Sequence, residues 1–131
     1  MQALEGLKVL DLSQFLSGPR CGQLLGDMGA DVIKLEPPIW GETMRLMLSP
    51  IVGMDRALSN WNRNKRGITL DLRNPKGREI YWKLVEKVDV VIENYAPGMM
   101  DKLGLSWEEH QKRNPRLIYC SIMGFGKTGP Y

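Results

Sequence analysis

The chain has 131 residues, of which 43% are hydrophobic and 25% charged, and its formal net charge is +3 at pH 7. This length suits one compact domain with one core, and the composition excludes a disordered or low-complexity chain. The small positive charge is far from the dense basic surface of a nucleic-acid-binding protein, so no nucleic-acid partner is expected.

Cysteine and histidine residues are too few and too scattered for metal or hydrolase chemistry. Cys21 and Cys120 are isolated, and His110 is the only histidine in the sequence. We therefore predict no metal site and no Ser-His-Asp arrangement, with two buried thiols and a histidine on a helix surface. The sequence starts without a basic stretch followed by an apolar run, and no window is long enough to cross a membrane. This predicts a cytoplasmic protein with no membrane partner, or one of the mitochondrial matrix in a eukaryote.

The first half of the chain is typical of a strand–helix–strand unit. Residues 8–13 (KVLDLS) form a short apolar run that predicts a buried strand. A helix is expected to begin near Ser17 and to end at Gly29. Its predicted apolar stripe consists of Cys21, Leu24, Leu25 and Met28. Residues 31–36 (DVIKLE) predict a second strand, and residues 37–61 an irregular excursion across the sheet edge.

The second half continues the alternation of strands and helices. Residues 67–72 (GITLDL) predict a third strand, and Asn74 with Pro75 predicts the start of a helix. The apolar stripe of that helix consists of Ile80, Tyr81, Leu84, Val85 and Val88. The remaining elements are a strand at 89–93, a short helix at 97–103, a helix capped by Ser106 and a strand at 116–123. The pattern predicts an α/β fold, a Rossmann-like open parallel sheet with flanking helices.

Ligands of such sheets bind beyond the carboxyl ends of the strands, so nucleotide motifs are expected there. The dinucleotide pattern G-x-G-x-x-G is absent. Instead Gly18, Gly22 and Gly26 are spaced by four, which places them on one helix face and favours close helix packing over NAD binding. The glycine-rich end of the chain contains Gly-Lys-Thr, but Ser121 stands where a phosphate-binding loop requires glycine, which argues against an ATPase.

Two polar segments leave alternatives open. Residues 62–66 (NRNKR) precede a strand, and they predict either a clamp for a phosphate-rich ligand or a solvated charged turn. Residues 93–98 (ENYAPG) combine an amide, an aromatic ring and a proline-started helix. They predict either a site for a purine and an anion or an Asn-mediated turn.

Taken together, an ordered series of short motifs resembles the class III coenzyme A transferases (the CaiB/BaiF, formyl-CoA transferase-like family). The motifs are residues 4–12 (LEGLKVLDL), 18–19 (GP), 25–37 (LGDMGADVIKLEP), 64–66 (NKR), 93–98 (ENYAPG) and 124–130 (GFGKTGP). The resemblance covers essentially the whole chain but only about the first third of a family member. It implies that residues 1–131 are the N-terminal part of a coenzyme A-binding large domain. The full-length protein is expected to form an interlocked homodimer. The remainder of its fold is expected to be absent from this segment.

The resemblance also implies which residues contact coenzyme A, the substrate, with no permanently bound cofactor. The implied contacts are Leu16, Ser17, Leu70, Asp71, Leu72, Arg73, Asn94, Tyr95, Ala96 and Lys102. Lys102 stands where many relatives have arginine, which keeps the charge but loses the bidentate fork. Pro37 occupies a position that is often basic, so one contact to adenine or phosphate is expected to be missing.

The family reaction moves coenzyme A from an acyl-CoA donor to a small carboxylic acid through an aspartyl-CoA intermediate. The catalytic aspartate of the family follows the Gly-Phe-Gly motif, and it is therefore expected beyond Tyr131. The 131-residue segment alone is accordingly expected to be inactive. The donor and acceptor acids stay open, among them formate, oxalate, carnitine and succinate.

Two other functions remain as alternatives. An α-methylacyl-CoA racemase shares the fold but uses a His/Asp pair, which would also lie beyond Tyr131. Residues 93–95 (ENY) favour the transferase, because racemases that resemble this segment usually lack the asparagine. The alternative from another class is a non-catalytic module that binds a nucleotide or coenzyme A.

Overall fold

The computed structural model describes residues 1–48, 55–126 and 128–130. Its strands are β1 (Lys8–Asp11), β2 (Asp31–Glu36), β3 (Lys65–Thr69), β4 (Val90–Glu93) and β5 (Ile118–Ser121). They form one five-stranded sheet in the order β3-β2-β1-β4-β5, and every neighbouring pair is parallel. The predicted α/β fold with an open parallel sheet is confirmed.

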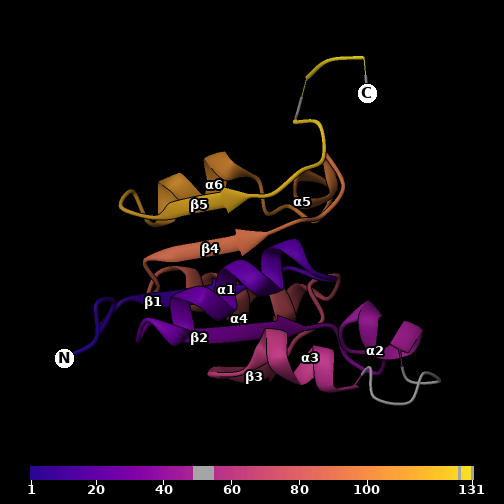
Figure 1. Ribbon diagram of the computed structural model, residues 1–131. Coiled ribbons are helices and arrows are strands. Elements are labelled where there is room, and N and C mark those ends of the chain that lie inside the picture. The colour runs from indigo at the N-terminus through magenta and orange to yellow at the C-terminus, as the bar shows by residue number, and fades with distance from the viewer. Residues whose placement is uncertain (49–54, 127, 131) are drawn as a thin grey trace.

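Helices cover both faces of this sheet. They are α1 (Ser17–Asp27), α2 (Thr43–Leu48), α3 (Asp55–Asn62), α4 (Pro75–Val85), α5 (Met99–Lys102) and α6 (Trp107–Arg113). In Figure 1, α1 and α3 lie in front of the sheet and α4 behind it; α1 packs against α3, and α4 against α6. None of the described helices is both long enough and apolar enough to cross a membrane.

The excursion after β2 is more regular than expected. We predicted residues 37–61 as irregular, but the structure places α2 and α3 in this segment, and residues 49–54 lie outside the described part. Pro50 and Gly53 interrupt the sequence pattern, so neither helix shows the length or periodicity that predicts a helix. Contacts of α3 with α1 supply the stabilisation that local sequence does not.

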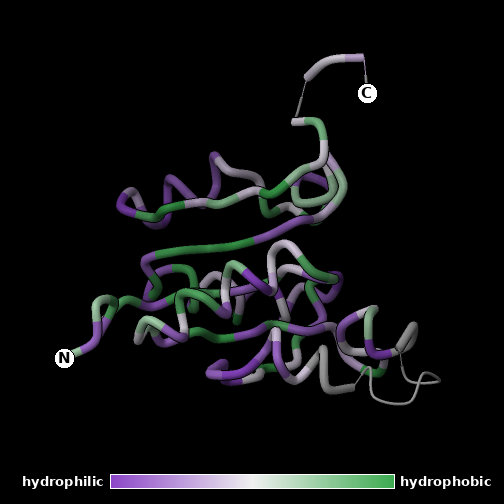
Figure 2. The backbone as a smooth tube through the Cα atoms, viewed as in Figure 1, coloured by the Kyte–Doolittle hydropathy of each residue, from purple (hydrophilic) through white to green (hydrophobic). Residues whose placement is uncertain are grey.

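Two apolar clusters form the core, one on each face of the sheet. The larger cluster joins the sheet to α4 and α5 and includes Leu10, Tyr81, Val85, Val91 and Leu105. The smaller one lies on the α1 side and consists of Val9, Ala30, Val32, Val90 and Ile92. Since both of its faces are covered, all four residues of β4 are buried, and Figure 2 shows this strand as largely hydrophobic.

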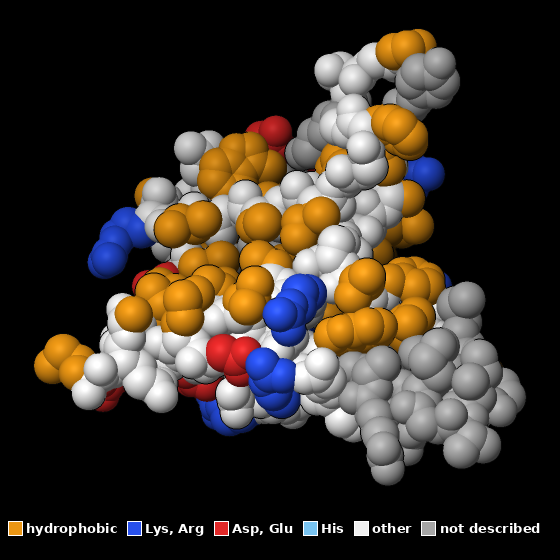
Figure 3. All heavy atoms as spheres, viewed as in Figure 1, with side chains coloured by type: hydrophobic (Ala, Val, Ile, Leu, Met, Phe, Trp, Pro, Cys, Tyr) orange, Lys and Arg blue, Asp and Glu red, His pale blue; other side chains and the backbone are white. Residues whose placement is uncertain are grey.

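Helix α1 packs through its glycines rather than through the full predicted stripe. A Cβ atom added at Gly18 would lie 2.1 Å from the Cβ atom of Ser13, and one at Gly22 would lie 2.7 Å from Asp11 Oδ2. The expected role of the glycines in close packing is thus confirmed. The stripe is partly wrong, because Leu24 and Met28 are 45% and 44% exposed. Figure 3 shows hydrophobic side chains gathered on this face, over α1 and β5.

The predicted starts of α4 and α6 are confirmed. Asn74 Oδ1 accepts a hydrogen bond from the backbone N–H of Lys76 at 3.0 Å, with Pro75 at the first helical position. Ser106 Oγ accepts from the N–H of Glu109 at 3.4 Å. Of the predicted stripe of α4, Ile80 alone is 44% exposed, whereas Tyr81 and Val85 are fully buried.

His110 was predicted on a helix surface, and this is wrong. Its side chain is fully buried because α6 packs against α4 and β5. His110 Nε2 lies 2.6 Å from the hydroxyl of Tyr81, and Nδ1 lies 2.7 Å from the carbonyl oxygen of Ser106. This geometry fits a neutral ring that donates from Nδ1 and accepts at Nε2. Burial lowers the pKa of His110 below its usual value of 6.5, although Ser106 and the charge of Glu93 oppose the shift.

We expect acid to destabilise the protein through His110. The unfolded state takes up a proton near pH 6.5, whereas the folded state resists it, so the free energy of unfolding falls as the pH drops below about 6.5. Urea unfolding at several pH values measures this loss. In His110→Gln, which still accepts a hydrogen bond from Tyr81, the acid-side loss is expected to be smaller; an identical pH profile in this variant would contradict the assignment.

Candidate functional site

The direction in which successive strands are added to the sheet reverses at β1. From β1 the chain moves outward through β2 to β3, and it then returns to the other side of β1 to form β4 and β5. The loops after β1 and β4 therefore separate at the carboxyl edge of the sheet, which is where ligands of such folds bind. Gln14 and Asn94 join these two loops. The N–H of Gln14 donates to Asn94 Oδ1, and Asn94 Nδ2 donates to the carbonyl oxygen of Gln14, both at 2.7 Å.

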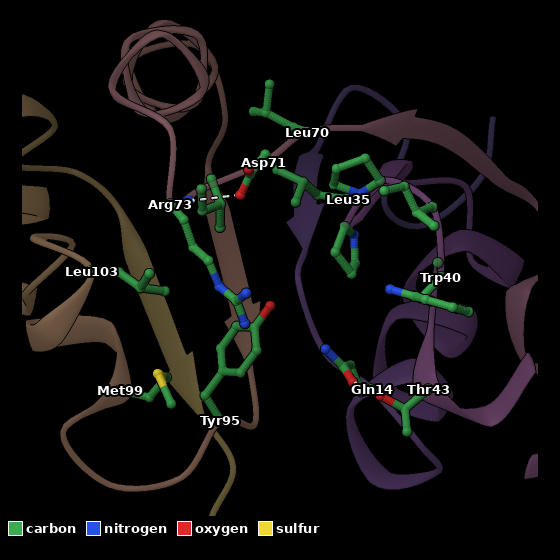
Figure 4. Close-up of a pocket in the computed structure, with 15 residues that line it drawn as sticks. Gln14, Leu35, Trp40, Thr43, Leu70, Asp71, Arg73, Tyr95, Met99 and Leu103 are labelled. Carbon is green, nitrogen blue, oxygen red and sulfur yellow. Dashed lines mark hydrogen bonds between the residues drawn. The ribbon is translucent and has the colours of Figure 1, made fainter. Parts of the chain in front are cut away.

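A cavity of about 520 Å³ opens beside this joint (Figure 4). Its walls come from the loop after β1, the segments after β2 and β3, and the loop and helix after β4. The lining residues are Gln14, Leu35, Pro37, Pro38, Ile39, Trp40, Gly41, Thr43, Leu70, Asp71, Leu72, Arg73, Tyr95, Met99 and Leu103. A largely apolar lining with a few polar groups is typical of a site for a small organic ligand.

The structure brings five of the ten predicted contact residues together in this cavity. They are Leu70, Asp71, Leu72, Arg73 and Tyr95. The other five lie outside it. Leu16 and Ser17 are exposed at the start of α1, Asn94 joins the two loops, and Lys102 is exposed on α5. Ala96 lines two smaller cavities, of about 230 and 320 Å³, on the other side of the β4 loop.

Arg73 and Tyr95, which follow β3 and β4 in the chain, form one wall of the cavity. The N–H of Arg73 donates to Asp71 Oδ1 at 2.9 Å, and the guanidinium extends into the cavity toward Tyr95 (Figure 4). No described residue forms an ion pair with this guanidinium. Burial raises the pKa of the Tyr95 hydroxyl, although a hydrogen bond with Gln14 opposes the shift. The wall thus offers a cation and a protonated hydroxyl.

The opposite wall is the loop after β2. The sequence indicated this loop as the start of an irregular excursion, and the family resemblance indicated that one contact to adenine or phosphate is missing at Pro37. Glu36 fixes the loop, because its carboxylate accepts two hydrogen bonds from Arg45, at 2.8 and 3.0 Å, and one from the N–H of Glu42 at 3.1 Å. Burial alone would raise the pKa of Glu36, but the bonds and charge of Arg45 outweigh it, so the pKa is lowered. Large apolar residues directly after a strand, here Ile39 and Trp40, are the signal that could have identified this wall.

The cations of residues 63–66 do not face the cavity. Arg63 pairs with Asp27 at 2.6 Å, Arg66 pairs with Asp31 at 2.7 Å, and Lys65 Nζ pairs with Asp11 at 2.8 Å. Each cation already has a carboxylate partner within the chain, which argues against the phosphate clamp. Nor is this a simple solvated turn, since the side chain of Lys65 is 1% exposed.

A buried network of charges lies beneath the β1 loop. Lys34 Nζ lies 3.8 Å from both Asp11 Oδ1 and Glu42 Oε2, and it donates to the carbonyl oxygen of Ser13. Burial lowers the pKa of Lys65, while the charge of Asp11 opposes this shift. The network connects β1, β2 and β3 with the loop before α2. Among the described residues, no group of three or more His, Cys, Asp or Glu side chains is placed to hold a metal ion.

Comparisons with known proteins agree with this architecture. The family model described as CoA-transferase family III matches residues 4–131. The chain is 48% identical to proteins named formyl-CoA:oxalate CoA-transferase from Bradyrhizobium sp. (strain ORS 278) and from Afipia carboxidovorans. Each match covers 99% of this chain, which spans 31% of the length of each relative.

Solved structures show the same similarity. A CAIB/BAIF family protein from Brucella suis superposes with a TM-score of 0.90 at 47% identity, over 99% of this chain and 35% of that one. A hypothetical protein of Mycobacterium tuberculosis, Rv3272, superposes with a TM-score of 0.86 at 37% identity, over 99% and 36%. By its family match, its relatives and its fold, the chain belongs to CoA-transferase family III.

Proposed function

We propose that this chain is the N-terminal part of the coenzyme A-binding large domain of a CoA transferase. The enzyme moves coenzyme A from an acyl-CoA to a small carboxylic acid. The observation that carries the proposal is the cavity beside the Gln14–Asn94 joint, in a chain of CoA-transferase family III. Because relatives that are 48% identical to the chain are named formyl-CoA:oxalate CoA-transferase, we propose formyl-CoA and oxalate as the first pair to test. The family resemblance adds an interlocked homodimer, and the substrates suggest the cytoplasm.

The chemistry of coenzyme A suits the cavity. The ligand carries an aromatic base, three phosphate groups and a flexible pantetheine arm. The apolar walls suit the base and the arm, while Arg73 supplies positive charge for a phosphate. We also propose that Leu16, Ser17, Asn94, Ala96 and Lys102 contact parts of the ligand that extend out of the cavity.

The proposed reaction uses an aspartate that lies beyond Tyr131. Its carboxylate attacks the thioester carbonyl of the donor, which releases the CoA thiolate and leaves a mixed anhydride. The thiolate then attacks the aspartyl carbonyl of that anhydride, so that the donor acid leaves and an aspartyl-CoA thioester forms. The acceptor carboxylate reverses these two steps and departs as the new acyl-CoA. In this proposal the N-terminal segment supplies binding and does not catalyse the transfer alone.

A transfer assay with the full-length enzyme tests this proposal. Formation of oxalyl-CoA from formyl-CoA and oxalate, with inactivation by hydroxylamine only when an acyl-CoA is present, would support transfer through an aspartyl thioester. Exchange of the α-hydrogen of a 2-methylacyl-CoA with solvent, without transfer, would instead assign a racemase. Binding of coenzyme A with neither activity would assign a binding module.

We expect Arg73→Ala to weaken coenzyme A binding about 10- to 100-fold, because a hydrogen bond to a charged group contributes about 1.5–3 kcal/mol. The effect should shrink as salt is raised, since salt screens the interaction with phosphate. Calorimetric titration of the full-length enzyme measures both. Arg116→Ala is the matched control, because Arg116 is also exposed but lies before β5, at the other edge of the sheet. An equal loss of coenzyme A affinity in the two variants would show that Arg73 does not contact the ligand.

A further inference from the structure

The loop between β2 and α2 exposes two large apolar side chains at the mouth of the cavity. Ile39 is 90% exposed and Trp40 is 64% exposed, and both line the cavity. Leaving such surface in water forfeits the free energy that its burial would release. Exposed apolar side chains that gather at a cavity mark a place where a ligand covers them.

This loop is held in one conformation. Pro37 and Pro38 restrict its backbone. The N–H of Trp40 donates a hydrogen bond to the carbonyl oxygen of Pro38 at 2.9 Å, and the N–H of Gly41 donates one to the carbonyl oxygen of Pro37 at 3.2 Å. Ile39 has a φ of 73°, a left-handed conformation that β-branched residues rarely adopt. Backbone strain of this kind persists where the surroundings enforce it, and it concentrates at ligand sites. The restrained backbone of the loop therefore keeps Trp40 at the mouth of the cavity.

The two walls of the cavity differ in chemistry. Arg73 is the one cationic side chain among the described lining residues, and it lies on the wall opposite Trp40 (Figure 4). The one acidic lining residue, Asp71, turns its carboxylate back to the N–H of Arg73. An indole on one wall and a guanidinium on the other suit a ligand that has an aromatic ring at one end and anionic groups a short distance away.

From this arrangement we propose that Trp40 stacks on the adenine ring of coenzyme A and supplies affinity for the adenosine part of the ligand. The adenosine phosphates then extend across the cavity toward Arg73. Purine bases stack on aromatic side chains whatever their hydrogen-bonding edge, so an exposed indole at the mouth of the cavity is sufficient for this contact. The inference rests on the proposed coenzyme A binding of the same cavity.

The test compares two ligands and three substitutions in the full-length enzyme. Coenzyme A contains adenosine, whereas 4′-phosphopantetheine lacks it. We expect Trp40→Ala to weaken coenzyme A binding about tenfold and to leave 4′-phosphopantetheine binding unchanged, while Trp40→Phe keeps most of the affinity. Ile118→Ala is the matched control, because Ile118 is 61% exposed on β5 and lies outside the cavity. Coenzyme A should also quench indole fluorescence in the wild type and much less in Trp40→Phe.

The outcomes separate this inference from the proposed function. Tight binding of coenzyme A by the wild type and an equal affinity of Trp40→Ala would overturn the stacking role and leave the proposed function standing. An equal loss for both ligands would also overturn it, because the substitution would then act on the cavity as a whole. No binding of coenzyme A by a folded wild type would overturn both.

Discussion

Replacing Lys65 by methionine is expected to lower the free energy of unfolding by about 3 kcal/mol. This is the lower end of the range of about 3–5 kcal/mol for a buried ion pair that loses one partner. Lys65 Nζ donates to Asp11 Oδ2 and to the carbonyl oxygen of Pro19, both at 2.8 Å, and to Asn62 Oδ1 at 3.1 Å. Methionine fills the same volume but supplies no charge, so the fully buried carboxylate of Asp11 loses its nearest cation. Urea unfolding measures the loss.

The control for this prediction is a salt bridge on the surface. Arg66 and Asp31 also form an ion pair, but their side chains are 66% and 44% exposed. Arg66→Met should therefore cost about 1 kcal/mol or less. The double variant Asp11→Asn/Lys65→Met should recover part of the loss, because no carboxylate is then left without its cation. A single Lys65→Met variant as stable as Arg66→Met would contradict the role assigned to the buried pair.

Gly77→Ala is expected to reduce stability by about 3 kcal/mol and to weaken coenzyme A binding as well. A Cβ atom at position 77 would lie 2.0 Å from the carbonyl oxygen of Asp71 and 2.9 Å from its carbonyl carbon. These are backbone atoms, so no side chain can rotate away, and α4 must move relative to the segment before it. Overpacking of this kind costs about 1–3 kcal/mol and occasionally more. Because Asp71 and Arg73 line the cavity, the displacement also alters the site.

Gly67→Ala is the matched control for this substitution. Gly67 lies in β3, and a Cβ atom there would have no neighbour within 4 Å. Gly67→Ala should leave both the free energy of unfolding and the dissociation constant of coenzyme A close to their wild-type values. If Gly77→Ala lost stability but bound coenzyme A normally, the segment after β3 would not be part of the site. If it lost neither, the close approach of α4 to Asp71 would be wrong.

The amino-acid sequence by itself determined the features that depend on neighbouring residues. The strand predicted at residues 31–36 has the observed bounds of β2, and the caps at Asn74 and Ser106 form as expected. Each depends on a run of β-branched residues or on a side chain within three positions of its partner. The order of these elements predicted the parallel sheet, and the short motifs predicted the family to which the chain belongs.

Tertiary structure alone decided which charges and which faces are buried. Lys65 meets Asp11 across 54 positions of sequence, and Gln14 meets Asn94 across 80. The burial of His110 likewise depends on α4, and the cavity has Trp40 and Arg73 on opposite walls only because the folded chain brings their two loops to one edge of the sheet. No local pattern encodes such contacts, because a side chain's surroundings are set by elements that the topology of the sheet brings together.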